Sequence, residues 1–206
     1  MHGLVDRNRI FIDRMRDVGV LTTPDAIDWG YAGPILRSTG VPRDLRKDTP
    51  YLAYDELDFE VPVGIKGDNY DRYFVRMCEM DESVHMIRQL VEMLPEGPIN
   101  VDDRRCTFPE KNLVYGEIES LINHFKLVMD GPQVPPGEVY SAHEGANGEL
   151  GFYIVSVGGG VPWKVHCRSP SFVHMGGVHR MLDGYQLADI VPTFGSVNMI
   201  GGECDR

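Results

Sequence analysis

The sequence predicts a mainly helical α+β fold with a small antiparallel sheet in its C-terminal part. Two long stretches repeat apolar residues every three or four positions, which is typical of helices that bury one face. Beyond them the pattern changes to the alternation of strands, and three consecutive glycines separate two of these. A chain of 206 residues is long enough for one domain with a substantial core.

Two helices are expected at the N-terminal end. Apolar residues within 1–16 fit a helix, although no clear N-cap precedes them. Thr23, Pro24 and Asp25 form a typical helix start, with Thr23 as the N-cap and proline at the first helical position. Gly30 predicts the end of this short helix.

The stretch 33–67 is rich in glycine, proline and charge, which predicts a long ordered loop of the kind that is often functional. Within it, 59–63 is a candidate strand, which Pro62 would confine to a sheet edge because proline cannot donate to a ladder. The basic residues from Arg37 to Lys47 are interpreted as a solvated run.

The clearest helix is expected over Asp68–Leu94, with Asp68 as its N-cap. A second amphipathic helix is expected over Asn112–Met129, and the polar connection predicts that the two pack antiparallel. The residues expected to face the core are Tyr70, Tyr73, Phe74, Met77, Val84, Ile87, Val91 and Leu94 in the first helix, and Val114, Ile118, Leu121, Phe125 and Val128 in the second.

Three strands should follow, with a hairpin at the glycine run 158–160; the alternative for this run, a phosphate-binding nest, is disfavoured because no helix follows it. The predicted strands are Glu138–His143, Leu150–Val157 and Pro162–Arg168. Helices are then expected over Phe172–Leu182, with Ser171 as a candidate N-cap, and over Tyr185–Ile190.

The composition argues against several classes of partner. Lys+Arg is 20 against Asp+Glu 31, a formal net charge of −11, which disfavours nucleic acid and an anionic membrane face as binding partners. No apolar run approaches the roughly 18–20 residues of a membrane helix, and charged residues interrupt any signal-peptide core near the start. The four cysteines form no CxxC and are expected to be reduced thiols.

Standard catalytic motifs are absent from the sequence. There is no P-loop, dinucleotide-binding GxGxxG, GxSxG elbow or HExxH. His166, His174 and His179 have spacings that do not share one helical face, so we interpret them as ordinary core or surface residues. Arg72 and Arg76 are candidates for ion pairs with Glu79 and Asp71 in their own helix.

The C-terminal residues 193–206 are small, glycine-rich and polar, and they end in acidic residues and an arginine. Glycines allow tight backbone paths, so this composition suits a segment that runs into the protein and lines a space there. A frayed, solvated tail is the alternative.

Several segments, in order along almost the whole chain, resemble the D subunit of NADH-quinone oxidoreductase, the respiratory complex I. The tail is similar to that family's closing pattern GSxDxxxGxxDR. The other similar segments are Asn8–Thr22, Gly30–Pro50, Tyr54–Met80, Glu149–Tyr153 and Arg168–Phe172. The resemblance implies a fold like that of the nickel–iron hydrogenase large subunit. It also implies that residues 1–206 are the C-terminal half of such a subunit, without its N-terminal half.

The resemblance further implies a quinone cavity where hydrogenases hold their metal. Hydrogenase tails supply two thiolates through a CxxC, but this chain has Asn198 and Gly201 at its ends, so no metal is expected. Asn198, Ile200 and Gly201 are expected to line the cavity, and Asp205 and Arg206 to anchor the tail. The alternative is that these residues only pack an interface between subunits.

Two departures from the family pattern are expected to matter. The family usually has aspartate where this chain has Asn198, and arginine where it has Asn147. The histidine and tyrosine that contact the quinone in the family lie in the absent half, so no residue of this chain is assigned a catalytic role.

By resemblance, the chain belongs to the quinone-reducing module of an enzyme that passes electrons from NADH to a quinone and translocates protons. Quinone is the expected substrate. The iron–sulfur cluster is expected in a neighbouring subunit, with no cofactor bound by this chain alone. Its expected partners are other complex I subunits, and its expected location is peripheral, on the cytoplasmic side of the inner membrane. An energy-converting hydrogenase subunit and a non-catalytic scaffold of the same ancestry remain alternatives.

Overall fold

The computed structural model describes residues 5–205, and the chain falls into two compact units. Unit 1 comprises Met1–Met93, Ala142–Gly151 and Arg168–Arg206, and unit 2 comprises Leu94–Ser141 and Phe152–Cys167. About half of the structure is helical and it contains one three-stranded sheet, so the expected mainly helical α+β class is confirmed.

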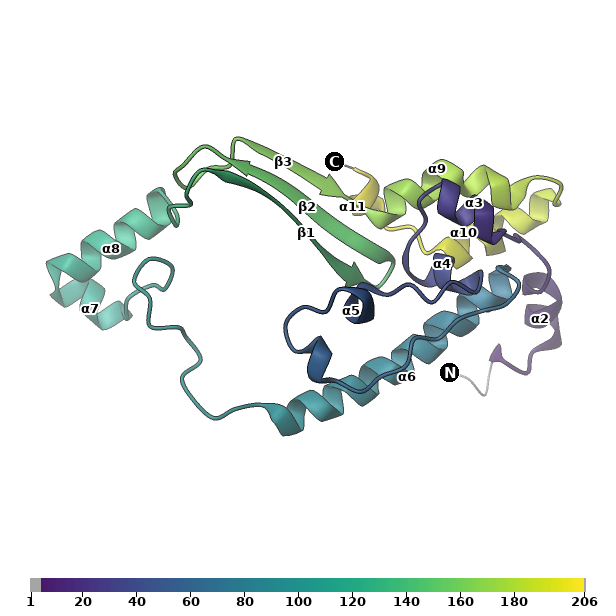
Figure 1. Ribbon diagram of the computed structural model, residues 1–206, viewed down its shortest axis with the longest axis horizontal. Helices are drawn as coiled ribbons and strands as arrows, with labels where there is room; N and C mark the ends of the chain where they lie inside the picture. Colours follow the sequence, from purple (N-terminus) through teal and green to yellow (C-terminus); the bar gives the residue numbers. More distant parts are fainter. Residues whose placement is uncertain (1–4, 206) are drawn as a thin grey trace. The chain divides into compact units, whose positions relative to one another are not determined.

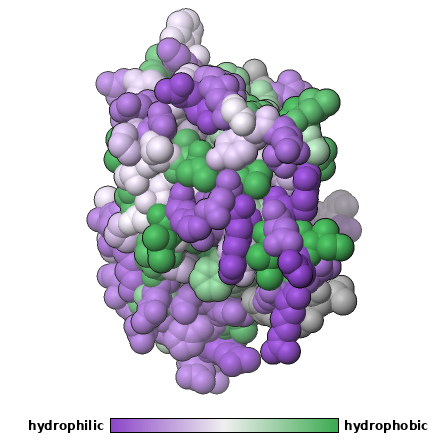
Figure 2. All heavy atoms as spheres, turned by 90° about the vertical axis from the view of Figure 1, so that its right-hand side faces the viewer, coloured by the Kyte–Doolittle hydropathy of each residue, from purple (hydrophilic) through white to green (hydrophobic). Residues whose placement is uncertain are grey.

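Unit 1 is built from helices (Figure 1). They are α2 (Arg9–Met15), α3 (Thr23–Asp28), α4 (Gly33–Ser38), α5 (Leu45–Asp48), the 3-10 turn η1 (Tyr54–Glu56), α6 (Asn69–Met93), α9 (Pro170–Leu182), η2 (Leu187–Asp189), α10 (Ile190–Val197) and α11 (Gly201–Cys204). The hydrophobic core joins segments from both ends of the chain: Leu21, Ala26, Tyr31, Ile35, Leu36, Met181 and Val197. On the side of unit 1 that carries α2, hydrophobic residues form separate patches among hydrophilic ones (Figure 2).

Two predicted helix starts are correct to within one or two residues, but their caps are different. Thr22 caps α3 by accepting a hydrogen bond from the N–H of Asp25, whereas the predicted cap Thr23 donates its hydroxyl to the carbonyl of Thr39. Ser169, not Ser171, caps α9 by accepting from the N–H of Phe172. In both cases the residue before the proline-containing first turn has the extended backbone that an N-cap requires.

The predicted long loop over 33–67 is wrong in part, because α4, α5 and η1 lie within it. Residues 59–63 form no strand. Helices as short as α4 and α5, with six and four residues, have little stability of their own. They form here because tertiary contacts hold them, most clearly the buried side chain of Arg37 in α4, and periodicity in the sequence does not show such contacts.

The long helix α6 lies within one residue of its predicted bounds, and Asp68 caps it by accepting from the N–H of Asp71 at 2.8 Å. Its predicted apolar face is mostly wrong, however. Met77 is buried, but Phe74, Val84, Ile87 and Val91 are exposed. The buried positions of α6 are Asn69, Arg72, Val75, Met77 and Met86, so polar residues occupy much of the side that faces the core of unit 1.

Unit 2 contains α7 (Lys111–Gly116), α8 (Ile118–Met129) and most of the sheet strands β1 (Gly137–Gly145), β2 (Gly148–Ser156) and β3 (Lys164–Arg168). The strands pair in the order β1-β2-β3, and their short connections make the sheet antiparallel, as predicted. The glycine run 158–160 lies between β2 and β3, which confirms the hairpin.

The helix predicted over Asn112–Met129 is interrupted at Glu117, which forms both the end of α7 and the N-cap of α8. Ile118, Leu121, Phe125 and Val128 are exposed rather than buried in this chain. Because α6 and α8 belong to different units, their antiparallel packing stays a prediction. None of the helices described is both long enough and apolar enough to span a bilayer.

Candidate functional site: a cavity beside the C-terminal segment

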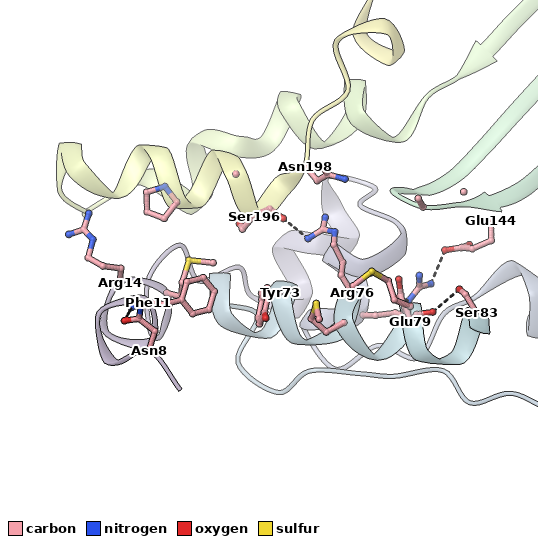
Figure 3. Close-up of a pocket in the computed structure, with 18 of the residues that line it drawn as sticks. Asn8, Phe11, Arg14, Tyr73, Arg76, Glu79, Ser83, Glu144, Ser196 and Asn198 are labelled. Atoms are coloured by element: carbon pink, nitrogen blue, oxygen red, sulfur yellow. Dashed lines mark hydrogen bonds and ion pairs between the residues drawn. The ribbon is translucent and has the colours of Figure 1, made fainter. Parts of the chain in front are cut away.

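A cavity of about 970 Å³ lies within unit 1, between helices α2, α6 and α10 and the turn that joins β1 to β2 (Figure 3). This volume is at the upper end of the range of about 300–1,000 Å³ that is usual for small-molecule sites. Its wall changes in character from one end to the other, since α2 contributes mainly apolar side chains, with Arg14 as the exception, and the β1–β2 turn lies beside a group of buried charges.

The apolar part of the wall comes from α2 and α6. Phe11 of α2 packs edge-on against Tyr73 of α6, with ring centroids 5.0 Å apart. Met15, Met77 and Met80 complete this part of the lining. Methionine side chains are flexible and polarisable, so such a wall adapts to flat or irregular apolar ligands.

The charged part of the wall is organised around Arg37, whose side chain is only 1% exposed. Its guanidinium donates to Glu79 Oε1 at 2.7 Å, to Glu144 Oε1 at 2.8 Å and to the carbonyl of Arg43 at 2.9 Å. Asp44, also fully buried, lies 3.6 Å from the same guanidinium. Figure 3 shows Glu79 on α6 and Glu144 near the β1–β2 turn, at the same end of the cavity.

The pKa values of this group show two opposing effects. Burial raises the pKa of Glu79 above its ordinary value, although Arg37 acts to lower it. Burial also disfavours the charge of Arg37, but the carboxylates of Glu79 and Glu144 outweigh that effect and raise its pKa. Arg37 therefore stays charged, while Glu79 is easier to protonate than a carboxylate in water.

Arg76 links the cavity to the end of α10. Its guanidinium donates to the carbonyl of Ser196 at 2.6 Å and to that of Val197 at 3.1 Å, at the last turn of the helix. Its Nε is buried and has no hydrogen-bond partner among the described residues. Burial lowers the pKa of Arg76 to about 10. A cation at this position offsets the negative end of the helix dipole and satisfies carbonyls that α10 leaves unpaired.

Arg72 holds the same helix from one turn earlier in α6. It is fully buried, and it donates to Ser196 Oγ at 2.9 Å and to the carbonyls of Gly19 and Gly67 at 2.7 Å each. Burial is the main cause that lowers its pKa to about 10. Neither Arg72 nor Arg76 forms the ion pair within α6 that the sequence suggests, because both side chains reach carbonyl and hydroxyl groups of other segments.

The C-terminal segment is held inward at its start. Thr193, Ser196 and Val197 are buried, and Asn198 lines the cavity. Further along, Glu203 accepts hydrogen bonds from the N–H and hydroxyl of Ser171. These contacts favour the inward path over a frayed tail.

The remaining predicted site residues lie elsewhere. Ile200 and Gly201 are exposed and are not among the described residues that line this cavity. Asp205 is exposed, and Arg206 lies outside the described residues. The roles predicted for these four residues, in a quinone cavity or as an anchor, stay predictions.

Sequence patterns do not identify Arg37, Arg76, Glu79 and Glu144 as site residues. The interpretation of Arg37 as part of a solvated run is wrong, because its side chain is buried. The sequence contains one indication of this group: polar residues recur at helical spacing at positions 69, 72, 76 and 79. Polar residues on the inner side of a helix usually have buried hydrogen-bond partners, because burying them without partners is costly.

His174 is buried in the core of unit 1. Its ring stacks on Tyr31 with centroids 5.2 Å apart, and its Nε2 accepts from the N–H of Ala32 at 3.4 Å. Burial first, and then the charges of Arg168 and Arg76, lower its pKa to about 3. Within residues 5–205, no cluster of three or more His, Cys, Asp or Glu side chains could hold a metal ion.

Comparison with known proteins gives a consistent result. The family described as "Respiratory-chain NADH dehydrogenase, 49 Kd subunit" matches residues 1–206. The NADH-quinone oxidoreductase D subunit of Pelobacter propionicus is 67% identical over 206 residues, all of this chain and 51% of that protein. The D subunit of Myxococcus xanthus is 53% identical over 206 residues, which are all of this chain and 50% of that protein. The D subunit of Rhodospirillum rubrum is 47% identical over 203 residues, which are 98% of this chain and 52% of that protein.

The chain therefore spans about half the length of these relatives. The match nonetheless covers every segment that builds the cavity and the C-terminal segment beside it. This chain belongs to the family of the 49 kDa subunit of respiratory-chain NADH dehydrogenase, which includes the D subunit of NADH-quinone oxidoreductase.

Proposed function

We propose that this chain forms part of the quinone-reducing module of an NADH-quinone oxidoreductase. In this proposal electrons from NADH pass through iron–sulfur clusters to a quinone, and the whole complex couples the reaction to proton translocation. The observation that carries the proposal is the family match along the whole chain, at up to 67% identity with a D subunit of such an enzyme. The clusters and the NADH site are assigned to other subunits, and this chain alone is expected to be inactive.

The cavity has the chemistry that a quinone site needs. A quinone is a flat ring with two carbonyl oxygens and an apolar tail, and its reduction takes up two electrons and two protons. Phe11, Tyr73 and the methionines offer an apolar wall for such a ring, and the charged group around Arg37 lies at the other end. Glu79, whose pKa burial raises, is suited to hold a proton beside the cavity.

The two tail positions that match the hydrogenase CxxC do not suit a thiolate-bound metal, because Asn198 and Gly201 carry no sulfur and Cys204 is a single thiol outside them. This chemistry supports a quinone module over a hydrogenase in this family. The proposed partners are the other subunits of the complex, above all the one with the terminal iron–sulfur cluster. Attachment at the cytoplasmic side of the inner membrane would occur through these partners.

The test is an assembled complex purified through an affinity tag on another subunit. Met80 lines the cavity, so Met80→Trp should raise the KM for a short-chain quinone by reducing the free volume. The matched control is Ile65→Trp, at a residue that is 91% exposed and outside the cavity lining. NADH oxidation by ferricyanide, which accepts electrons ahead of the quinone, should be the same in both variant complexes and in the unmodified one.

Two results would refute this proposal. One is a purified complex that contains the chain but has no NADH:quinone reductase activity. The other is full quinone reductase activity in a complex from cells that lack the chain, which would leave the scaffold alternative.

A further inference from the structure

Two asparagines far apart in the sequence meet at the edge of the cavity. Asn198 Nδ2 donates to Asn147 Oδ1 at 2.9 Å, and Asn147 Nδ2 donates to the backbone carbonyl of Asn198 at 3.0 Å. Asn147 belongs to the β1–β2 turn and is only 2% exposed. The pair is therefore a reciprocal contact between the buried side chain of the turn and an exposed residue of the C-terminal segment.

The backbone of Asn198 makes this position special. It has φ 56° and ψ 49°, the left-handed conformation, and it ends α10. Asparagine adopts this conformation more readily than most residues, so it suits the end of a helix where the chain turns sharply. The direction in which the tail leaves α10 is thus set at the residue that pairs with Asn147.

The pair lies where the other contacts on the tail converge. Arg76 holds the carbonyls just before Asn198, and Ser171 Oγ accepts from the N–H of Ile200 just after it. Asn147 Nδ2 also lies 3.5 Å from Ser171 Oγ. The tail is thus held from α6, from α9 and from the β1–β2 turn. The contacts from α6 and from the turn involve residues that line the cavity, namely Arg76 and Asn198.

The Asn147–Asn198 contact carries no charge, although charged side chains lie on the segments around it. The guanidinium of Arg76 and the carboxylates of Glu144 and Glu203 lie on the segments around it. An amide carries both a donor and an acceptor, so two asparagines can satisfy one another without burying a charge. The two departures from the family pattern, at positions 147 and 198, are therefore a single contact in this chain rather than two separate losses of charge.

We propose that the Asn147–Asn198 pair is a positioning contact that fixes the cavity wall at the end of α10 and thereby sets the affinity for the quinone. This inference rests on the proposed function. Neither residue is assigned a chemical step. Loss of the side-chain hydrogen bond should loosen the wall, so the KM for quinone should rise while kcat changes little.

The experiment uses the assembled complex and three variants. Asn198→Gly keeps the left-handed backbone and removes only the side chain. Asn198→Asp places a carboxylate against Asn147 Oδ1 and removes the donor. Each should raise the KM for a short-chain quinone roughly three- to tenfold, the range for one lost hydrogen bond. The double variant Asn147→Arg with Asn198→Asp can restore the contact as an ion pair, and its KM should return toward that of the unmodified complex.

Asn100→Asp is the matched control, because Asn100 is exposed in unit 2 and should leave the KM unchanged. Ferricyanide reduction and subunit content report assembly. If Asn198→Asp fails to assemble, Asn198→Gly still decides the question. An unchanged KM in an assembled Asn198→Gly complex would overturn the inference, as would a double variant no better than Asn198→Asp. An unmodified complex without quinone reductase activity would instead refute the proposed function.

Discussion

Replacing Arg37 with methionine should destabilise unit 1 far more than the same change at an exposed arginine. Methionine has a similar length but cannot donate hydrogen bonds. The substitution leaves Glu79 and Glu144 without the guanidinium that lies 2.7 Å and 2.8 Å from them. Removing one partner from a buried ion pair costs about 3–5 kcal/mol, because the remaining charge stays buried and uncompensated.

The matched control is Arg43→Met. Arg43 lies 3.7 Å from Glu149, but its side chain is 58% exposed. A pair of this kind contributes about 0–1 kcal/mol, because water screens it and replaces its hydrogen bonds. The two substitutions are chemically identical, so the difference between them reports the environment of each arginine: its burial and the number of carboxylates that it contacts.

The cost at Arg37 should also depend on pH. Burial already raises the pKa of Glu79 above its ordinary 4.5, and Arg37 is the main opposing cause. Without Arg37 the folded-state pKa rises further, so the fold takes up a proton more readily than the unfolded chain does. The penalty should therefore be largest at pH 7–8 and should shrink as the pH falls toward about 5.

Urea unfolding followed by tryptophan fluorescence measures these free energies. The chain has two tryptophans, and Trp163→Phe leaves Trp29 as the reporter for unit 1. A penalty below about 1 kcal/mol for Arg37→Met at pH 7.5, or a penalty that grows as the pH falls, would show that the buried carboxylates do not depend on Arg37.

Three further predictions concern unit 1. His174→Gln should reduce the loss of stability in acid. The pKa of His174 is about 3 in the fold against 6.5 ordinarily, so below pH 6.5 the unfolded chain binds a proton that the folded chain does not. The free energy of unfolding of the unmodified chain, measured in urea, should therefore fall by about 1.4 kcal/mol per pH unit in that range. Gly33→Ala should cost about 2 kcal/mol or more, because φ is +64° and a Cβ would collide with the backbone of Gly148, whereas Gly116→Ala meets no atom within 4 Å and should be nearly neutral. Glu203→Ala removes the acceptor for Ser171, and hydrogen exchange of the tail amides should become faster, while unchanged protection would contradict that anchor.

Features with a local cause could be predicted from the sequence. The bounds of α6 follow from the Asp68 cap and the proline at 95, and the sheet follows from alternating residues and a glycine turn. The charged group around Arg37 could not be predicted in this way. Its contacts join residues 42 and 107 positions apart, and no local pattern reports which loop will cover a helix.

For the candidate site, the sequence predicts only the inward path of the C-terminal segment. The family pattern and the glycine content predict that Asn198 lies at a wall, and the structure places it at a cavity. The sequence shows its partner Asn147 only as a missing charge. Two side chains 51 positions apart reveal their relation only when the fold brings them together.

Periodicity correctly predicted that α8 has an apolar stripe, but the prediction that the stripe is buried within this chain was wrong. Ile118, Leu121 and Phe125 recur at helical spacing, yet all three are exposed in this chain. Exposed apolar surface is unfavourable by roughly 25 cal/mol per Å², so a stripe of this kind is characteristic of surfaces that another element covers in the working protein. The chain spans about half the length of its relatives, and those relatives are named as subunits. Helical periodicity therefore reports that one face of α8 is apolar, but it does not report what lies against that face.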